Sequence, residues 1–515
     1  MGVAALDAAY LQVAHRFIRT SDDARIVLEA QDLLRGNWNL RGWVLTSDNF
    51  WPSEALWYVP AVARAGPVLA LLFQLPSLVY ALLVAASCAL AARPYHGWAA
   101  ASAATLTFLV IGLPPALWGG NFALAAIALR PAIHLGTMLL VLAALLLVDP
   151  GDETAAAPPV GPHPVRFGAA AVLFGCAIAG DPIAGWMVWV PCALVVALDA
   201  VGPARRQAGA VVVWLAASLV LAGALLSLAA STGGFVDVHS DVVLTAPGQT
   251  GPNLLQFVRW WFALGGGDVL GLPAAPQTVL VLGRSVLCAV VLWCVGVELT
   301  TWIRHRRRGR WLDAVLAAAV VVSAAEMVLS TQGSQSRYVV PALFCGAILA
   351  GRRAGAALAA GPTDRRARGG YAALALAAVV SIPAFLLHFL VPPAPQPELP
   401  VARWLQEHRL SYGYGAYWDA SIMTVETAGR VAVRPVVEEQ GRLTRWLQLS
   451  SARWYTMPPQ FVVFTGDPAV ALERGMTVAA AARTLGGPVR ILKMGAYTVV
   501  VRVPVPGGAA RPAPP

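Results

Sequence analysis

The sequence predicts an α-helical, multi-pass membrane protein with a small extracytoplasmic α/β domain at its C-terminal end. Of the 515 residues, 58% are hydrophobic and only 12% are charged, whereas roughly 25% are charged in ordinary globular chains. The apolar residues gather in about ten runs that are long enough to cross or nearly cross a bilayer. A soluble protein is therefore excluded, and so is disorder over most of the chain.

The predicted transmembrane body covers residues 67–391. Its apolar runs fall at 67–92, 97–116, 132–148, 167–180, 183–199, 208–230, 277–300, 312–329, 338–351 and 371–391. As a helix, the run 167–180 would rise only about 21 Å, against a bilayer core of about 30 Å. Asp181, which follows it, is then expected below the outer surface, where an acid faces a cavity or a partner and serves a function. Alternatively, Asp181 only caps the next helix.

The two sides of the membrane are assigned from the arginines between the runs. The connections on one side hold fourteen arginines, whereas those on the other side hold three. Since short cytoplasmic loops retain positive charge, the arginine-rich side is predicted to be cytoplasmic. Residues 1–66, 231–276 and 392–515 are then extracytoplasmic, which places the active site on the outer face. The net charge of +10 follows from this distribution, so that no nucleic-acid partner is expected.

Residues 1–66 are predicted to form the first extracytoplasmic loop, which contains an amphipathic helix. Within Ala24–Leu34, apolar residues recur with the period of a helix that lies along the membrane surface. Met1–Thr20 has no signal-peptide core. A first span that is clipped or missing is therefore expected, which would bring the total to about eleven spans.

Asp22 and Asp23 stand at the start of this amphipathic helix. The helix dipole favours their ionised form at this position, so that they can accept a proton or hold a metal ion. The alternative is that the two acids only cap the helix.

Residues 392–515 are predicted to form the α/β domain, because helix-like and strand-like segments alternate after a Pro-rich linker. The helix-like segments are Val401–His408 and Asp419–Ala428, and the strand-like segments are Arg430–Pro435, Phe461–Thr465, Val489–Lys493 and Tyr497–Val503.

An aromatic segment lies between the two helix-like parts of this domain. Tyr412, Tyr414, Tyr417 and Trp418 fall within seven residues. Aromatic faces stack on the apolar faces of sugar rings, so these four residues are candidates for binding an acceptor. Alternatively, they pack the domain against the membrane body.

Several short sequence motifs occur in a fixed order along the chain. They are Asp22-Asp23-Ala24, Leu33-Leu34-Arg35-Gly36-Asn37, Arg41-Gly42-Trp43, Asp48-Asn49-Phe50-Trp51, His134-Leu135-Gly136-Thr137 and Tyr412–Ala420. The residues of these motifs and their order resemble those of a group of bacterial multi-pass membrane proteins in the GT-C class of integral membrane glycosyltransferases. That class includes the protein O-mannosyltransferases and the lipid A aminoarabinose transferases. The resemblance in architecture covers nearly the whole chain.

The resemblance implies that a sugar moves from a polyprenyl-phosphate donor to a glycan, lipid or protein acceptor on the outer face of the cell membrane. An acid of the first outer loop would take the proton of the acceptor hydroxyl, and the match supports Asp22 more than Asp23. A divalent cation is left open, with Asp22 and Asp23 as its ligands. The candidates for binding the donor and its phosphate are Arg130, His134, Arg337, Asp181, Asp48 and Glu54.

Two other functions stay open at this point. The protein could be a flippase or another transporter of lipid-linked sugars, or a non-catalytic membrane protein of envelope assembly. A transporter is expected to carry paired charges or broken helices near the midplane, usually in repeated halves. No such repeat is visible in the sequence, and the acids concentrate in the predicted outer segments.

Overall fold

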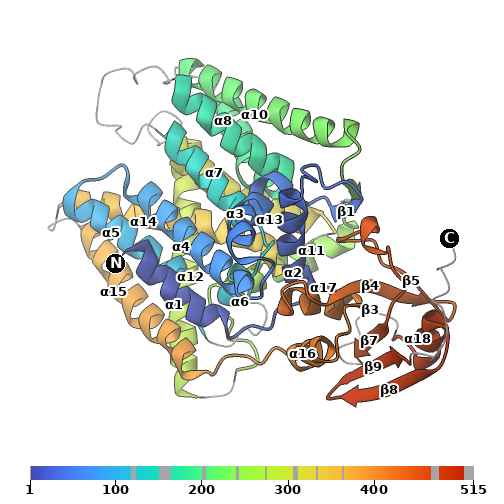
Figure 1. The fold of residues 1–515 in the computed structure, drawn as a ribbon. Coiled ribbons are helices and arrows are strands. Elements are labelled where there is room, and N and C mark those ends of the chain that lie inside the picture. The colour runs from blue at the N-terminus through green and yellow to red at the C-terminus, as the bar shows by residue number, and fades with distance from the viewer. Residues whose placement is uncertain are drawn as a thin grey trace.

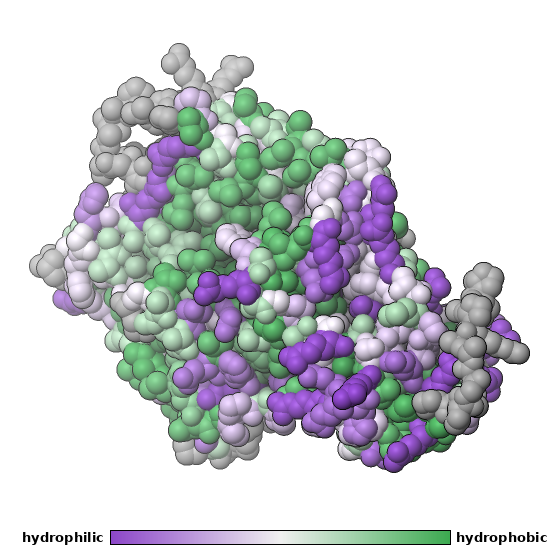
Figure 2. Space-filling view, in the orientation of Figure 1, coloured by the Kyte–Doolittle hydropathy of each residue, from purple (hydrophilic) through white to green (hydrophobic). Residues whose placement is uncertain are grey.

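The computed structural model of the chain describes residues 2–116, 123–149, 164–199, 205–238, 243–272, 275–304, 311–331, 335–361, 365–465 and 475–503. Long helices form one body, and the red C-terminal domain stands beside it (Figure 1). Hydrophobic residues cover the visible face of the helical body, whereas hydrophilic residues gather over the C-terminal domain (Figure 2).

Each of the ten predicted apolar runs coincides with a helix. The helices are α4 (Leu71–Ala92), α5 (Gly97–Thr107) continued by the π-helical turn η2 (Phe108–Gly112), α7 (Leu135–Val148), α8 (Pro164–Gly180), η4 (Gly185–Trp189) continued by α9 (Val190–Asp199), α10 (Arg205–Ser231), α12 (Pro276–Arg304), α13 (Trp311–Leu329), η6 (Ser336–Val339) continued by α14 (Val340–Ala359), and α15 (Arg365–Leu386) continued by η7 (Leu387–Leu390). Within the described ranges, six helices are long and apolar enough to cross a membrane, and the other apolar helices are shorter. The protein is therefore a multi-pass membrane protein, as predicted.

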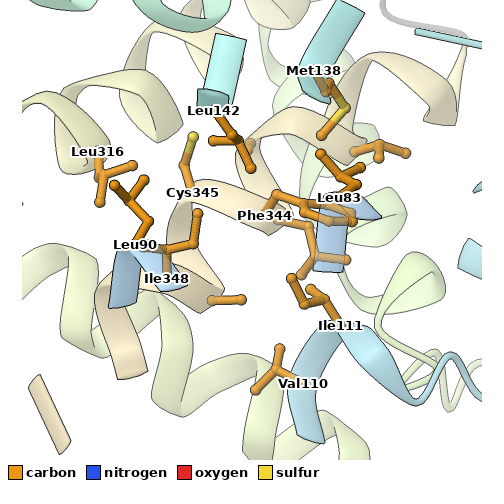
Figure 3. Packing of buried hydrophobic residues seen from close by; sticks show 14 of the residues in the cluster. Leu83, Leu90, Val110, Ile111, Met138, Leu142, Leu316, Phe344, Cys345 and Ile348 are labelled. Carbon is orange, nitrogen blue, oxygen red and sulfur yellow. The ribbon is translucent and has the colours of Figure 1, made fainter. Parts of the chain in front are cut away.

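Helix α14 lies inside this body, packed against α4, α5, α12, α13 and α15. Phe344 of α14 is fully buried among residues such as Leu83 of α4 and Ile111 of η2 (Figure 3). A Cβ added at Gly351 would lie 2.1 Å from Thr107 Oγ1 of α5. The absence of a side chain at this glycine lets the two helices approach each other closely.

An additional apolar helix, α1 (Val3–Ala14), precedes the first loop and packs against α4. Tyr10 of α1 is fully buried, and its hydroxyl donates a hydrogen bond to the carbonyl of Gly112 at 2.6 Å. This helix stands where the sequence analysis expected a clipped or missing first span.

The first loop folds between the helical body and the C-terminal domain. Its elements are α2 (Ser21–Leu34), β1 (Trp43–Thr46), the π-helical turn η1 (Trp51–Ala55) and α3 (Leu56–Ala65). Strand β1 pairs in parallel with β2 (Val236–Val238) and antiparallel with β6 (Ser450–Ser451). This three-stranded sheet ties the first loop to the segment after α10 and to the C-terminal domain. Two further helices of the body are α6 (Leu124–Ala128) and α11 (Thr250–Leu264).

The C-terminal domain contains a mixed six-stranded sheet in the order β5-β4-β3-β7-β9-β8. Its inner strand β3 pairs in parallel with both β4 and β7. The strands are β3 (Tyr412–Ala416), β4 (Ala432–Glu439), β5 (Arg442–Arg445), β7 (Phe461–Thr465), β8 (Val489–Met494) and β9 (Tyr497–Arg502), and the helices are α16 (Leu399–Glu407), α17 (Tyr417–Glu426) and α18 (Val478–Leu485). The predicted fold class, a helical membrane protein with a C-terminal α/β domain, is confirmed.

Helix α2 is more deeply buried than the predicted surface helix would be. All residues from Asp23 to Ala30 are buried, because α2 packs on α3 of the first loop and also on α17 of the C-terminal domain. The face that was expected to meet water is thus covered by a segment almost four hundred residues away in the sequence.

Candidate active site

Asp23 is a capping residue at the start of α2. Its Oδ2 accepts hydrogen bonds from the amide of Thr20 at 2.8 Å and from the Thr20 hydroxyl at 3.2 Å. The guanidinium of Arg130 lies 3.4 Å from the same oxygen. The side chain of Asp23 is buried. Its carboxylate is therefore engaged in holding the helix start and Arg130.

Asp22 is oriented differently and contacts the C-terminal domain. The hydroxyl of Tyr417 donates a hydrogen bond to Asp22 Oδ1. Burial raises the pKa of Asp22 above its usual value, opposed by the hydrogen bond from Tyr417 and by the charges of Arg25 and Arg130. A partly exposed carboxylate with a raised pKa is suited to take a proton from a hydroxyl group.

His134 is held at the start of α7 by Asp181. Its Nδ1 lies 2.6 Å from Asp181 Oδ2, and the ring centroids of Phe50 and Tyr338 are each 5.6 Å from its own. The side chain is 2% exposed, and its Nε2 has no hydrogen-bond partner among the described residues. Since buried polar groups are almost always paired, Nε2 is available for a ligand.

Asp48 and Arg337 form an ion pair in the same region, at 3.9 Å. Burial by itself would raise the pKa of Asp48, but the charges of His134, Arg337 and Arg25 outweigh burial and lower it. Asp48 is therefore ionised. Arg337 also donates a hydrogen bond to the hydroxyl of Tyr338 at 3.1 Å, which fixes the direction of its guanidinium.

Glu54 connects η1 to the start of α7. Its Oε1 accepts a hydrogen bond from the amide of Gly136 at 3.0 Å. Burial raises the pKa of Glu54 to about 7, although His134 and the Gly136 amide act in the opposite direction. A Cβ at Gly136 would lie 2.5 Å from Glu54 Cγ, and a Cβ at Gly180 would lie 2.3 Å from Ser53 Oγ. Glycine at both positions lets η1 sit directly on α7 and α8.

Arg25 stands between Asp22 and Asp48, and the sequence analysis assigned it no role. It is 4% exposed, and its Nη1 lies 3.5 Å from Glu29 Oε1 without forming a hydrogen bond with a described residue. Burial lowers the pKa of Arg25, but the charges of Glu29, Asp48 and Asp22 outweigh burial and raise it. A buried guanidinium with an unused donor is suited to bind a phosphate. The sequence feature that could have identified Arg25 is its position on the predicted helix, three residues after Asp22 and four before Glu29, which places it near both acids.

The predicted acceptor residues of the C-terminal domain fall into two places. Tyr417 and Trp418 begin α17 and contact the start of α2, where the Trp418 carbonyl accepts a hydrogen bond from the Ser21 hydroxyl at 2.9 Å. Tyr412 and Tyr414 lie on β3 with ring centroids 6.1 Å apart. Tyr412 is buried, whereas Tyr414 is partly exposed. The ring centroid of Tyr414 also lies 6.0 Å from that of Tyr455.

The proposed cation ligands, Asp22 and Asp23, stand next to each other in sequence but have separate partners. Asp23 already bonds Thr20 and Arg130, and Asp22 already bonds Tyr417. Within the described ranges, no group of three or more His, Cys, Asp or Glu side chains is arranged to hold a metal ion. The divalent cation therefore stays a prediction from the resemblance.

The arrangement of helical body, first loop and C-terminal domain is also found in solved structures. ArnT from Cupriavidus metallidurans in the apo state matches with a TM-score of 0.55 at 14% identity, over 97% of this chain and 96% of that chain. The same protein bound to undecaprenyl phosphate matches with a TM-score of 0.54 at 13% identity, over 99% of this chain and 98% of that chain. This chain shares its fold with ArnT.

The likeness to ArnT confirms the GT-C-type fold that the sequence predicted. No protein-family model and no curated protein sequence matches the chain. Since one fold hosts different functions, the activity has to be argued from the residues of the site.

Proposed function

We propose that this protein is a membrane glycosyltransferase that moves a sugar from a polyprenyl-phosphate donor to a hydroxyl group of an extracytoplasmic acceptor. The observation that carries the proposal is the position of Asp22 next to the buried Arg25, one of whose N–H groups donates no hydrogen bond to a described residue. The carboxylate suits an acceptor hydroxyl, and the guanidinium suits a leaving phosphate. ArnT, which has the same fold, binds undecaprenyl phosphate, and this supports a lipid phosphate as the leaving group.

The carboxylate of Asp22 would act as the general base. It takes the proton of the acceptor hydroxyl while the oxygen attacks the anomeric carbon of the donor sugar. The bond between that carbon and the phosphate oxygen breaks, and the lipid phosphate leaves with the electron pair. The raised pKa of Asp22 makes its carboxylate a stronger base than an exposed one.

Three side chains would stabilise the leaving phosphate. The charges of Arg25 and Arg337 both lower the pKa of Asp48, so the two guanidinium groups lie in one region around that carboxylate. His134, held through Nδ1 by Asp181, offers to the same region its Nε2, which has no hydrogen-bond partner in the described part of the chain. Fixed positive charges and N–H donors stabilise negative charge as it develops in the transition state.

A small pocket lies next to the site. Arg130 and Glu54 supply its polar groups. Its other walls are Trp57, Tyr58, Pro76, Val79, Pro131, Leu135 and Gly136. The walls are mainly apolar, and the guanidinium of Arg130 among them suits a phosphate group.

Turnover of labelled polyprenyl-phosphate sugars by the purified protein in detergent tests this proposal. We expect release of free polyprenyl phosphate together with a glycosylated product. A folded protein that releases nothing from a panel of sugars and acceptors, yet moves the lipid-linked sugar across a vesicle membrane, would instead identify a flippase.

Reporter fusions test the proposed placement of the site on the outer face. A fusion after Arg366 at the start of α15 is expected to report the cytoplasm, because the arginine-rich connections lie there. A fusion after Ala428, at the end of α17, is expected to report the outer side. A cytoplasmic signal from the second fusion would contradict the orientation and with it the extracytoplasmic acceptor.

The C-terminal domain is proposed to select the acceptor through its aromatic residues. Tyr414→Ala and Trp418→Ala are expected to raise the apparent KM for the acceptor severalfold, with hydrolysis of the donor unaffected, because sugar rings stack on aromatic faces. Acceptor titrations and donor hydrolysis would be measured on each variant. A lower melting temperature with parallel loss of both activities would show that these rings only pack the domain.

A further inference from the structure

Tyr417 reaches Asp22 from another domain and from 395 residues further along the chain. It is the first residue of α17. Its ring is buried, with centroids 5.0 Å from Trp418 and 5.5 Å from Trp446. Two neighbouring rings therefore restrict the phenol and fix the direction in which its hydroxyl points.

The contact between α2 and α17 does not depend on Tyr417. The Ser21 hydroxyl donates to the Trp418 carbonyl at 2.9 Å and accepts from the amide of Ser421 at 3.0 Å. Ile422 and Val425 of α17 are fully buried in one apolar cluster with side chains of α2. These contacts hold the C-terminal domain against α2, and the hydroxyl of Tyr417 is not needed for that docking.

On the basis of the proposed glycosyl transfer, we propose that Tyr417 is a positioning residue that aims the carboxylate of Asp22, so that the C-terminal domain completes the catalytic site. The hydroxyl bonds Oδ1, which leaves Oδ2 to take the proton of the acceptor. A carboxylate held in one orientation loses less entropy in the transition state than a freely rotating one. This role replaces the acceptor contact that the sequence suggested for Tyr417.

The charges around Asp22 determine what loss of the hydroxyl does. Asp23 and Arg25 face Asp22 from α2, Arg130 faces it from the segment after α6, and Tyr417 faces it from α17. The hydrogen bond from Tyr417 stabilises the ionised carboxylate and lowers its pKa. Removal of the hydroxyl therefore raises the pKa of Asp22, and the fraction of ionised base falls at the acidic end of the pH range.

Tyr417→Phe tests the proposal through the pH dependence of kcat/KM for transfer. The acidic limb of the profile is expected to move to higher pH, so that the variant loses roughly tenfold or more at low pH and recovers part of the loss as pH rises. Tyr455→Phe is the matched control, because the Tyr455 hydroxyl bonds the Pro435 carbonyl at 2.5 Å inside the same domain. A Tyr417→Phe profile that coincides with the parent, or that is lowered equally at every pH, would overturn the proposal.

3-Fluorotyrosine at position 417 gives a second test in which the ring is retained. Its hydroxyl is a stronger donor than that of tyrosine, so the acidic limb is expected to move to lower pH, opposite to the shift in Tyr417→Phe. Shifts in the same direction for both changes would mean that packing, and not the hydrogen bond, controls the activity.

Thermal unfolding of the full-length protein tests the hydrogen bond between Tyr417 and Asp22 without measuring enzymatic activity. Tyr417→Phe is expected to lower the melting temperature of the parent by more than that of an Asp22→Ala background, because each change removes the hydrogen bond between Tyr417 and Asp22. Equal shifts in the two backgrounds would contradict the contact. Full activity of Asp22→Asn would refute the proposed function itself, whereas an inactive Asp22→Asn with an unshifted Tyr417→Phe profile would refute only the role of Tyr417.

Discussion

Asp22→Asn is expected to slow sugar transfer by about 10² to 10⁴-fold, which is the usual contribution of a general base. The amide of asparagine can still accept a hydrogen bond from Tyr417, but it cannot take a proton from the acceptor. Since Asp22 is only partly buried and does not cap α2, the melting temperature should change little. Initial rates at saturating donor and acceptor, measured together with thermal unfolding, would establish both points.

Asp23→Asn is the matched control for this prediction. Asp23 belongs to the capping box of α2 and pairs with Arg130, so loss of its charge should lower stability by about 0.5–1 kcal/mol and affect transfer less than Asp22→Asn does. An Asp22→Asn protein as active as the parent would refute the catalytic assignment. If that variant failed to fold, Asp22 would instead have a mainly structural role in α2.

Arg25→Gln is expected to reduce kcat by about 10² to 10³-fold, because it removes a fixed positive charge from the leaving phosphate. The protein should still fold near neutral pH. Burial already raises the pKa of Glu29 to about 7, and Arg25 opposes that rise. Without Arg25 the pKa of Glu29 rises further, so that Glu29 takes up a proton and does not remain as an unpaired buried charge. Rates and melting temperatures would be compared at several pH values.

The double variant Arg25→Gln with Glu29→Gln separates the two roles of Arg25. It removes the buried pair as a unit, so its stability should exceed that of Arg25→Gln above pH 7, while transfer stays equally slow. Glu29→Gln alone should retain most of the activity. If Glu29→Gln were as slow as Arg25→Gln, the ion pair, and not a contact with phosphate, would account for the loss.

The helical body could be predicted from the sequence because lipid imposes a strong and local requirement. A helix that crosses a bilayer must be apolar over its own length, and each predicted run indeed forms a helix. Strand β3 could not be predicted in this way, because Gly413 and Gly415 weaken the strand signal. The structure shows why they are there: a Cβ at Gly413 would lie 2.5 Å from the Phe461 ring, and one at Gly415 would lie 2.9 Å from Val433 Cγ1.

The candidate site was only partly predictable, because its residues come from distant segments. Asp22, Asp48 and His134 stood in distinctive strings, but their partners could not be assigned from local spacing. Arg25 was assigned no role, since nothing nearby in the sequence shows that α17 covers α2. Local patterns predict which residues are unusual, and the tertiary contacts decide which of them share a site.

The three-stranded sheet that joins β1, β2 and β6 has a consequence for biosynthesis. Trp43 pairs with Ser451, so about 400 residues must be synthesised before β1 acquires its second neighbour, and contacts of such long range form late. Until then the newly made protein has its transmembrane helices, but the three-stranded sheet still lacks β6. Premature termination before residue 450 would therefore leave β1 without its antiparallel neighbour β6.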